Sequence, residues 1–146
     1  MRAVALDSSV VLAWLLEDEG LRRQALALRA DLEAGLLAPL GAAPMRFELR
    51  NGLVTGARQG RIAWEEIGRE IAAFDRWRVP IEPRPVDGRL IELCREFGLG
   101  WADAHWVELS IRLGIPIVTA DQRLARQMAG GPAWVEWLGD RPLGGG

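Results

Sequence analysis

Short apolar runs alternate with helix-length amphipathic stretches along this chain, and this alternation constrains its fold more than any other feature of the sequence. The apolar runs have the length of buried strands, while the stretches between them repeat apolar residues at helical spacing. Parallel strands need a crossover connection, usually a helix, so this order of elements is typical of a parallel sheet. We therefore predict an α/β fold with five strands, at residues 3–6, 36–38, 79–82, 115–118 and 133–136.

About seven helices are predicted between and after these strands. The clearest one carries Leu21, Ala25, Leu28 and Leu32 at helical spacing and ends before Gly35. Glycine and proline residues mark the ends of the others, because both residue types favour turns over helices. The predicted helices cover residues 8–17, 21–34, 43–58, 62–77, 85–97, 102–113 and 121–129.

The chain has the size of one domain with its own core. It has 146 residues, of which 49% are hydrophobic, and a formal net charge of -2, values that fit a single globular domain. We assign residues 1–140 to this domain and residues 141–146 to a flexible glycine-rich tail. No apolar run approaches the roughly 20 residues of a membrane span, and the N-terminus lacks the pattern of a secretion signal. We therefore expect a cytoplasmic protein without a membrane partner.

The composition excludes several kinds of chemistry. A single cysteine, Cys94, rules out an internal disulfide and a cysteine-based zinc site. The sequence contains no lysine, which excludes P-loop nucleotide binding and Schiff-base catalysis. A phosphatase of the haloacid dehalogenase type is disfavoured for the same reason. The near-neutral net charge argues against a broad nucleic-acid-coating surface but allows a local arginine stripe.

Four acidic residues stand at positions where a charged side chain is usually unfavourable in a folded domain. Asp7 and Asp121 directly follow the first and fourth predicted strands, at the strand ends where parallel sheets bind ligands. Glu48 and Asp103 interrupt two otherwise amphipathic helices. Carboxylates that converge from such positions suit a hard divalent cation such as Mg²⁺ or Mn²⁺. Such a cation activates water and neutralises charge during phosphodiester hydrolysis.

Simpler interpretations of the same acids stay open at this stage. Asp7 and Asp121 each begin a predicted helix and could be N-caps, a use worth about 1 kcal/mol. Glu48 and Asp103 could be solvated helix positions. The single histidine, His105, points off the helix face that carries Asp103, so we assign it no role as ligand or base.

The segments around the four acids resemble those of a known family, the PIN domain, and within it the VapC-type toxins of toxin–antitoxin modules. The first segment is a strand that ends in aspartate and continues with small hydroxyl residues, and the second has a proline, then a glutamate, then an asparagine three residues on. Ala102 and Arg50 depart from the usual pattern of the family, but neither replaces an acid. The similar segments are residues 4–14, 43–53, 101–106 and 117–125, in the order of the family.

The resemblance implies both a fold and an activity. The fold would be a single PIN-like domain whose parallel five-stranded sheet has the strand order 3-2-1-4-5. The activity would be that of a Mg²⁺-dependent ribonuclease, with Mn²⁺ as a possible substitute. The metal-binding and catalytic acids of this ribonuclease would be Asp7, Glu48, Asp103 and Asp121.

Three polar residues near the acids receive supporting roles from the same resemblance. Ser9 and Thr119 would be hydroxyls that orient the carboxylates, and Asn51 would be a polar neighbour of Glu48. For Ser9 and its neighbour Ser8, capping of the first helix is an equally good interpretation.

The resemblance also implies partners. These are an RNA substrate, a VapB-like antitoxin and a second copy of the chain in a homodimer, with helices at 8–17 and 43–77 as the candidate antitoxin groove. The alternatives are a PIN-domain ribonuclease of RNA processing without an antitoxin and an inactive PIN-like interaction module. Four arginines on the helices beside Glu48 are either RNA phosphate ligands or solvated positions, and the seven tryptophans are expected in the core or a subunit interface. These arginines are Arg46, Arg50, Arg58 and Arg61.

Overall fold

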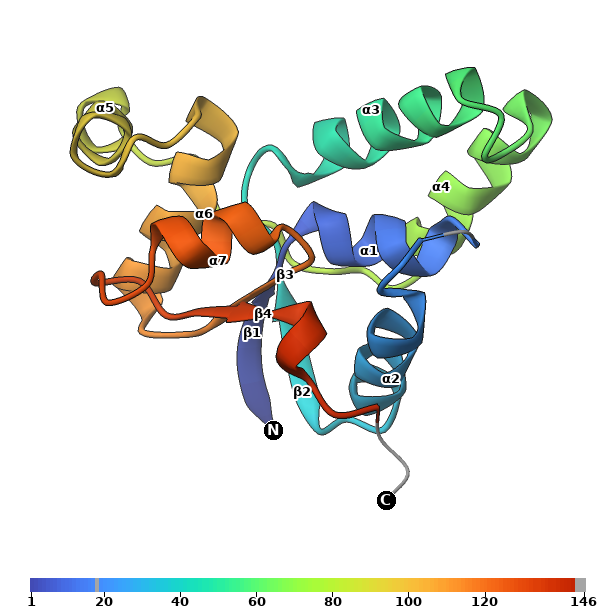
Figure 1. Ribbon diagram of the computed structural model, residues 1–146, viewed down its shortest axis with the longest axis horizontal. Helices are drawn as coiled ribbons and strands as arrows, with labels where there is room; N and C mark the ends of the chain where they lie inside the picture. The colour runs from blue at the N-terminus through green and yellow to red at the C-terminus, as the bar shows by residue number, and fades with distance from the viewer. Residues whose placement is uncertain (18, 144–146) are drawn as a thin grey trace.

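A four-stranded parallel sheet forms the centre of the fold (Figure 1). The computed structural model describes residues 1–17 and 19–143. The strands lie in the order β2-β1-β3-β4, so β1 is hydrogen-bonded along both of its edges. This parallel arrangement confirms the predicted α/β class. The strands are β1 (Arg2–Leu6), β2 (Leu37–Leu40), β3 (Ile117–Thr119) and β4 (Val135–Trp137).

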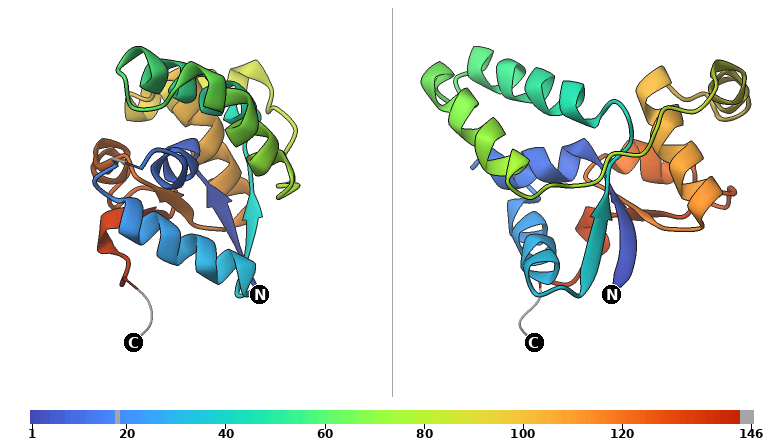
Figure 2. Two further views of the ribbon diagram at one scale, coloured as in Figure 1. Left: turned by 90° about the vertical axis from the view of Figure 1, so that its right-hand side faces the viewer. Right: turned by 180° about the vertical axis from the view of Figure 1, so that it is seen from behind.

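Seven α-helices are present among the described residues, as predicted. Helices α2 and α6 lie on opposite sides of the sheet, and α3 and α4 form a hairpin that extends beyond its end (Figure 2). Within the described part of the chain, no helix is long and apolar enough to cross a membrane. The helices are α1 (Ser8–Leu15), α2 (Arg22–Glu33), α3 (Met45–Arg58), α4 (Ile67–Asp75), α5 (Asp87–Phe97), α6 (Trp101–Leu113) and α7 (Gln122–Gln127), with short 3₁₀ turns η1 (Trp64–Glu66) and η2 (Leu138–Asp140).

The prediction of five strands is wrong, because residues 79–82 form a single parallel bridge instead of a strand. Gly41 pairs with Ile81 there, with one hydrogen bond from the Gly41 amide to the Pro80 carbonyl (2.8 Å) and one from the Glu82 amide to the Gly41 carbonyl (2.8 Å). Pro80 has no N–H and cannot extend this ladder. The segment still lies beside β2, where the predicted order placed its outermost strand.

Two further predictions concern segments at the edges of the fold. The helix predicted at 62–77 is divided into η1 and α4, because Ala63 is extended and the continuous α-helix begins only at Ile67. Residues 144–146 of the predicted tail lie outside the described residues. Arg141, at the start of that predicted tail, forms ion pairs with Asp31 (3.4 Å) and Glu136 (3.3 Å) and is held against the domain.

The core surrounds the central strand. Val4, Ala5 and Leu6 of β1 are fully buried, because helices cover both faces of the sheet. Trp106 of α6 is also fully buried, and the ring of Trp14 in α1 stacks on that of Trp77 with centroids 5.8 Å apart. Trp106 and Trp14 therefore belong to the core, which is one of the two locations predicted for the tryptophans.

Helix α3 packs closely over α1 at Gly52. A β-carbon at this position would lie 2.3 and 2.8 Å from the two methyl groups of Leu12 and 3.1 Å from its branch carbon. These separations are shorter than ordinary van der Waals contacts, so the absence of a side chain sets the distance between the two helices. Glu48 lies one turn before Gly52, and this contact therefore also sets its height above the end of β1.

We expect Gly52→Ala to lower the free energy of unfolding by about 1 kcal/mol, because overpacking by about 1 to 3 kcal/mol outweighs the gain in helix propensity of about 1 kcal/mol. Gly68→Ala in α4 is the matched control, since no heavy atom lies within 4 Å of its would-be β-carbon. It should raise stability by about 0.5 to 1 kcal/mol. Urea unfolding of both variants checks the contrast, and equal stabilisation by the two would contradict the described packing.

Candidate active site

The carboxyl ends of β1 and β3 lie side by side and bring two of the predicted acids into one region. Leu6 of β1 pairs with Val118 of β3, and the Asp7 amide donates to the Val118 carbonyl at 3.1 Å. Asp7 follows β1 directly and Asp121 lies two residues after β3. The first and fourth predicted strands are therefore neighbours, as in the predicted strand order.

Two hydroxyl groups fix the Asp7 carboxylate. Ser9 Oγ and Thr119 Oγ1 donate to Asp7 Oδ2 at 2.6 and 2.7 Å. The same hydroxyl oxygens accept from backbone amides, Ser9 Oγ from Ala120 (2.9 Å) and Thr119 Oγ1 from Asp121 (3.0 Å), which directs their protons toward the carboxylate. Among the described residues no hydrogen bond reaches Oδ1, so this oxygen is available to a further group.

Asp7 occupies the N-cap position of α1, but its side chain makes no capping hydrogen bond, so the capping interpretation is wrong for this residue. The side chain is 7% exposed. The pKa of Asp7 is raised to about 6, mainly by burial. The hydroxyls of Ser9 and Thr119 lower this pKa, and the negative charges of Glu48 and Asp103 contribute to its rise. A buried carboxylate in this position is costly to ionise without a cation.

Glu48 is held by two residues whose role the sequence analysis missed. Ser8 Oγ and Trp106 Nε1 both donate to Glu48 Oε1 at 3.0 Å. Burial raises the pKa of Glu48, these two hydrogen bonds lower it, and the charge of Asp103 raises it. The signal for Trp106 was present in the sequence, because it shares a helix face with Asp103 and a buried indole N–H needs an acceptor.

Asn51 lies one turn after Glu48 on the exposed face of α3. The hydrogen bonds to Glu48 come from Ser8 and Trp106, so Asn51 is a neighbour of this acid along the helix without fixing its carboxylate.

Arg123 links the other two acids. Its Nη2 atom lies 3.4 Å from Asp103 Oδ2 and 3.3 Å from Asp121 Oδ2. Burial raises the pKa of Asp103, the positive charge of Arg123 lowers it, and the charge of Asp121 raises it. Asp121 also accepts from the amides of Arg123 and Leu124, so the N-cap interpretation is right for this acid. Arg123 is not among the site residues predicted from the sequence.

The donor atoms fit a hard divalent cation, although the side chains do not enclose one as they stand. Within residues 1–17 and 19–143, no group of three or more His, Cys, Asp or Glu side chains is arranged to hold a metal ion. Arg123 engages two of the acids, while among the described residues no ion pair neutralises Asp7 or Glu48. Buried, mutually repelling carboxylate oxygens without a cationic partner are the donors that Mg²⁺ and Mn²⁺ prefer.

Comparison with known proteins agrees with this fold. The family model of the PIN domain matches residues 4–129, a span that includes all four acids. The fold is similar to that of PAE2754 from Pyrobaculum aerophilum (TM-score 0.68, 19% identity, 95% of this chain and 92% of that one). It is also similar to VapBC-1 from nontypeable Haemophilus influenzae (TM-score 0.57, 14% identity, 95% of this chain and 100% of that one). No curated protein sequence matches the chain.

We expect Asp7→Asn to stabilise the protein at pH 7.5 in a chelator. The folded-state pKa of Asp7, about 6, lies above the ordinary value of 3.8, so the folded state binds the proton more tightly and stability falls as pH rises from about 4 to 6. At neutral pH the ionised side chain costs on the order of 2 to 3 kcal/mol, and asparagine removes this cost while its carbonyl still accepts from Ser9 and Thr119.

Thermal unfolding at pH 7.5 and pH 4 tests this expectation, because the stabilisation should disappear at the lower pH. Asp140→Asn, at an exposed position, is the control for loss of a charge alone. Added Mg²⁺ should stabilise the parent protein more than the Asp7→Asn variant. Equal stability of variant and parent across this pH range would contradict the described burial of the charge.

Proposed function

The chain belongs to the PIN domain family, whose members are nucleases, and we propose that it is a Mg²⁺-dependent ribonuclease that hydrolyses phosphodiester bonds of RNA. The observation that carries the proposal is the buried acidic cluster at the ends of β1 and β3, in which Asp7 and Glu48 have no cationic partner among the described residues. Asp103 and Asp121 complete the cluster from α6 and from the start of α7.

In the proposed reaction, these four acids would hold the metal, which would supply an activated water and neutralise the charge that develops on the phosphate. The chain itself fixes the acids. Ser9 and Thr119 orient Asp7, and Ser8 together with Trp106 orients Glu48, because each pair of donors ends on a single carboxylate oxygen. In both carboxylates the second oxygen is thereby left for the metal.

Arg123 stands at the rim of this cluster. Its side chain is 67% exposed and bonds to Asp103 and Asp121 at 3.3 to 3.4 Å. We propose that this guanidinium turns from the acids to a substrate phosphate, since it can form two parallel hydrogen bonds to phosphate oxygens. The alternative is an inactive module in which the acids only cap helices. The capping bonds of the Asp121 side chain support it, and the absence of a capping bond from the Asp7 side chain opposes it.

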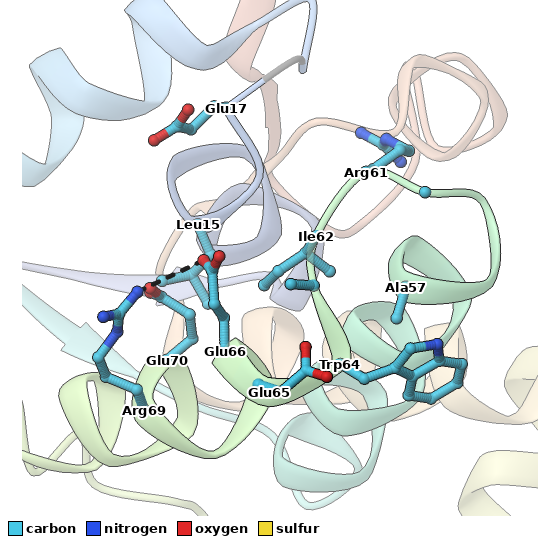
Figure 3. Close-up of a pocket in the computed structure, with 12 residues that line it drawn as sticks. Leu15, Glu17, Ala57, Arg61, Ile62, Trp64, Glu65, Glu66, Arg69 and Glu70 are labelled. Atoms are coloured by element: carbon cyan, nitrogen blue, oxygen red, sulfur yellow. Dashed lines mark hydrogen bonds and ion pairs between the residues drawn. The ribbon is translucent and has the colours of Figure 1, made fainter.

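We further propose that the enzyme is the toxin of a toxin–antitoxin pair, acting as a homodimer in the cytoplasm. The likeness to VapBC-1 supports this proposal at the level of the fold. The chain also has a hollow of about 620 Å³ between the ends of α1 and α3 and the start of α4, within the predicted groove at 8–17 and 43–77 (Figure 3). Leu15, Ala57 and Ile62 give it apolar walls, and Trp64 lies at its edge. None of the four acids lines this hollow, so a partner bound there would leave the acids in place.

We expect Asp7→Asn to reduce Mg²⁺-dependent cleavage of cellular RNA to the level of the buffer, because the acid at the centre of the cluster loses its charge. The fold should be intact, as checked by circular dichroism and thermal unfolding. Asp140→Asn, purified in parallel, should cleave like the parent protein and controls for contaminating ribonuclease. Cleavage by Asp7→Asn at the parental rate would contradict the proposed role of the acid.

We expect expression of the chain to arrest growth and a small protein encoded beside it to bind and suppress cleavage. Trp64→Ala should weaken that binding by about 30-fold, the effect of losing an interface tryptophan worth about 2 kcal/mol. Trp134→Ala is the matched control, because the two side chains are similarly exposed (54% and 50%) and Trp134 lies at the other end of the chain. Calorimetry measures both affinities. Cleavage without any such partner would instead identify a ribonuclease of RNA processing.

A further inference from the structure

Three arginines converge on a hollow between the start of α3 and the end of α4. The hollow has a volume of about 420 Å³ and is lined by Arg46, Arg50, Asp75, Arg78 and Val79. The chain that follows α4 runs back beneath α3 (Figure 2). Arg78 belongs to this segment and lines the hollow together with the two helix arginines. We call this site the arginine pocket. Three positive side chains face one acidic side chain in it, so the pocket carries excess positive charge.

These arginines differ from most others in the chain because acidic partners do not neutralise them. Arginines elsewhere form ion pairs, such as Arg84 with Asp87 and Arg112 with Glu108. Within the described residues, no ion pair involves an arginine of the pocket, and the one hydrogen bond that its guanidinium groups make runs from Arg50 to the Arg46 carbonyl at 3.1 Å. Three guanidinium groups beside one carboxylate, with no ion pair among them in the described part of the chain, are suited to bind an anion.

The backbone of Arg78 gives a second and independent indication. Its φ angle is 51°, and it is the single non-glycine residue with positive φ among the described residues. Side chains other than glycine are strained in this left-handed region, at a cost of roughly 1 kcal/mol or more. Glycine would relieve the strain but would remove the guanidinium from the pocket. The chain therefore holds a guanidinium in the pocket at a cost in backbone energy.

The arginine pocket and the acidic cluster lie on opposite flanks of the first turns of α3. Arg46 and Arg50 are one turn apart and share a flank, while the geometry of the helix turns Glu48 about 160° away from Arg50. Phe47 and Asn51 occupy the exposed surface between the two flanks, and Phe47 is 74% exposed. An extended strand that crosses α3 from the acids therefore meets an aromatic ring and then the arginines.

We propose that the arginine pocket binds a backbone phosphate of single-stranded RNA, and that a base of the same strand stacks on Phe47. The scissile bond then reaches the acids on the other flank of α3. Positive groups that follow the backbone, combined with exposed aromatic rings, are the usual way in which proteins hold single strands. This inference rests on the proposed ribonuclease function and adds to it the residues that hold the substrate beside the site of cleavage.

The test compares RNA affinity in four pocket variants and two matched controls, each in the Asp7→Asn background so that the probe stays intact. We call pocket variants Phe47→Ala, at the ring beside the pocket, together with the three substitutions inside it, Arg46→Ala, Arg50→Ala and Arg78→Gly. The last removes the charge and relieves the strained backbone, so it should fold at least as well as the parent. The controls, Arg76→Ala and Arg95→Ala, remove exposed arginines that have no ion pair among the described residues and do not line the pocket.

Fluorescence anisotropy with a short labelled single-stranded RNA of mixed sequence gives the affinities. Each pocket variant should bind about 10-fold more weakly than the parent, and the controls should stay within about 2-fold. Each arginine lost from the pocket should also reduce the slope of log affinity against log salt by about 0.7. With the acids intact, the pocket variants should raise KM for cleavage and leave kcat unchanged.

Equal losses in pocket and control variants, with cleavage by the parent intact, would overturn the inference and leave the proposed function standing. No RNA binding or cleavage by the parent would overturn both. Retained RNA affinity in the pocket variants, together with loss of binding to the adjacently encoded small protein, would assign the pocket to a protein partner and also overturn the inference.

Discussion

The paired hydrogen bonds from Ser9 and Thr119 to one oxygen of Asp7 are the interaction on which the rest of the site depends. They join the end of β1 to the start of α1 and to the end of β3, and they are themselves directed by backbone amides of the loop after β3. The same hydrogen bonds therefore link β1 to β3 and orient the Asp7 carboxylate. Because the sheet is buried and rigid at this point, the acid cannot turn away from its neighbours.

The molecule bears several unfavourable features at the same end of the fold. Burial and mutual repulsion raise the pKa of Asp7, Glu48 and Asp103, Arg78 has a strained backbone, and Phe47 is exposed. A core centred on β1 and α6 offsets these costs. Unfavourable local features gathered around one region, in a chain that is otherwise well packed, are typical of sites selected for binding or chemistry.

The sequence predicted the parts of this structure that depend on local patterns. Apolar runs located the strands, and the position of Asp7 and Asp121 after two of them placed both acids at one edge of the sheet. The strand predicted at residues 79–82 is absent because a proline interrupts its ladder. The sequence shows that a buried Trp106 needs an acceptor, but the choice of Glu48 as the acceptor of both Trp106 and Ser8 depends on how three helices pack together. The sequence pattern allowed Asp7 and Asp121 equally to be helix caps. In the structure, the side chain of Asp121 caps its helix and that of Asp7 does not.

The contact between Gly52 and Leu12 acts as a spacer for the acidic cluster. It sets how far α3 stands above α1, and α3 carries Glu48 while Asp7 lies between β1 and the start of α1. The separation of these two carboxylates is thus governed by a side chain that is absent, at a residue that bears no charge and touches no substrate. A protein engineer could therefore tune the width of the cluster at this position without altering a single acid.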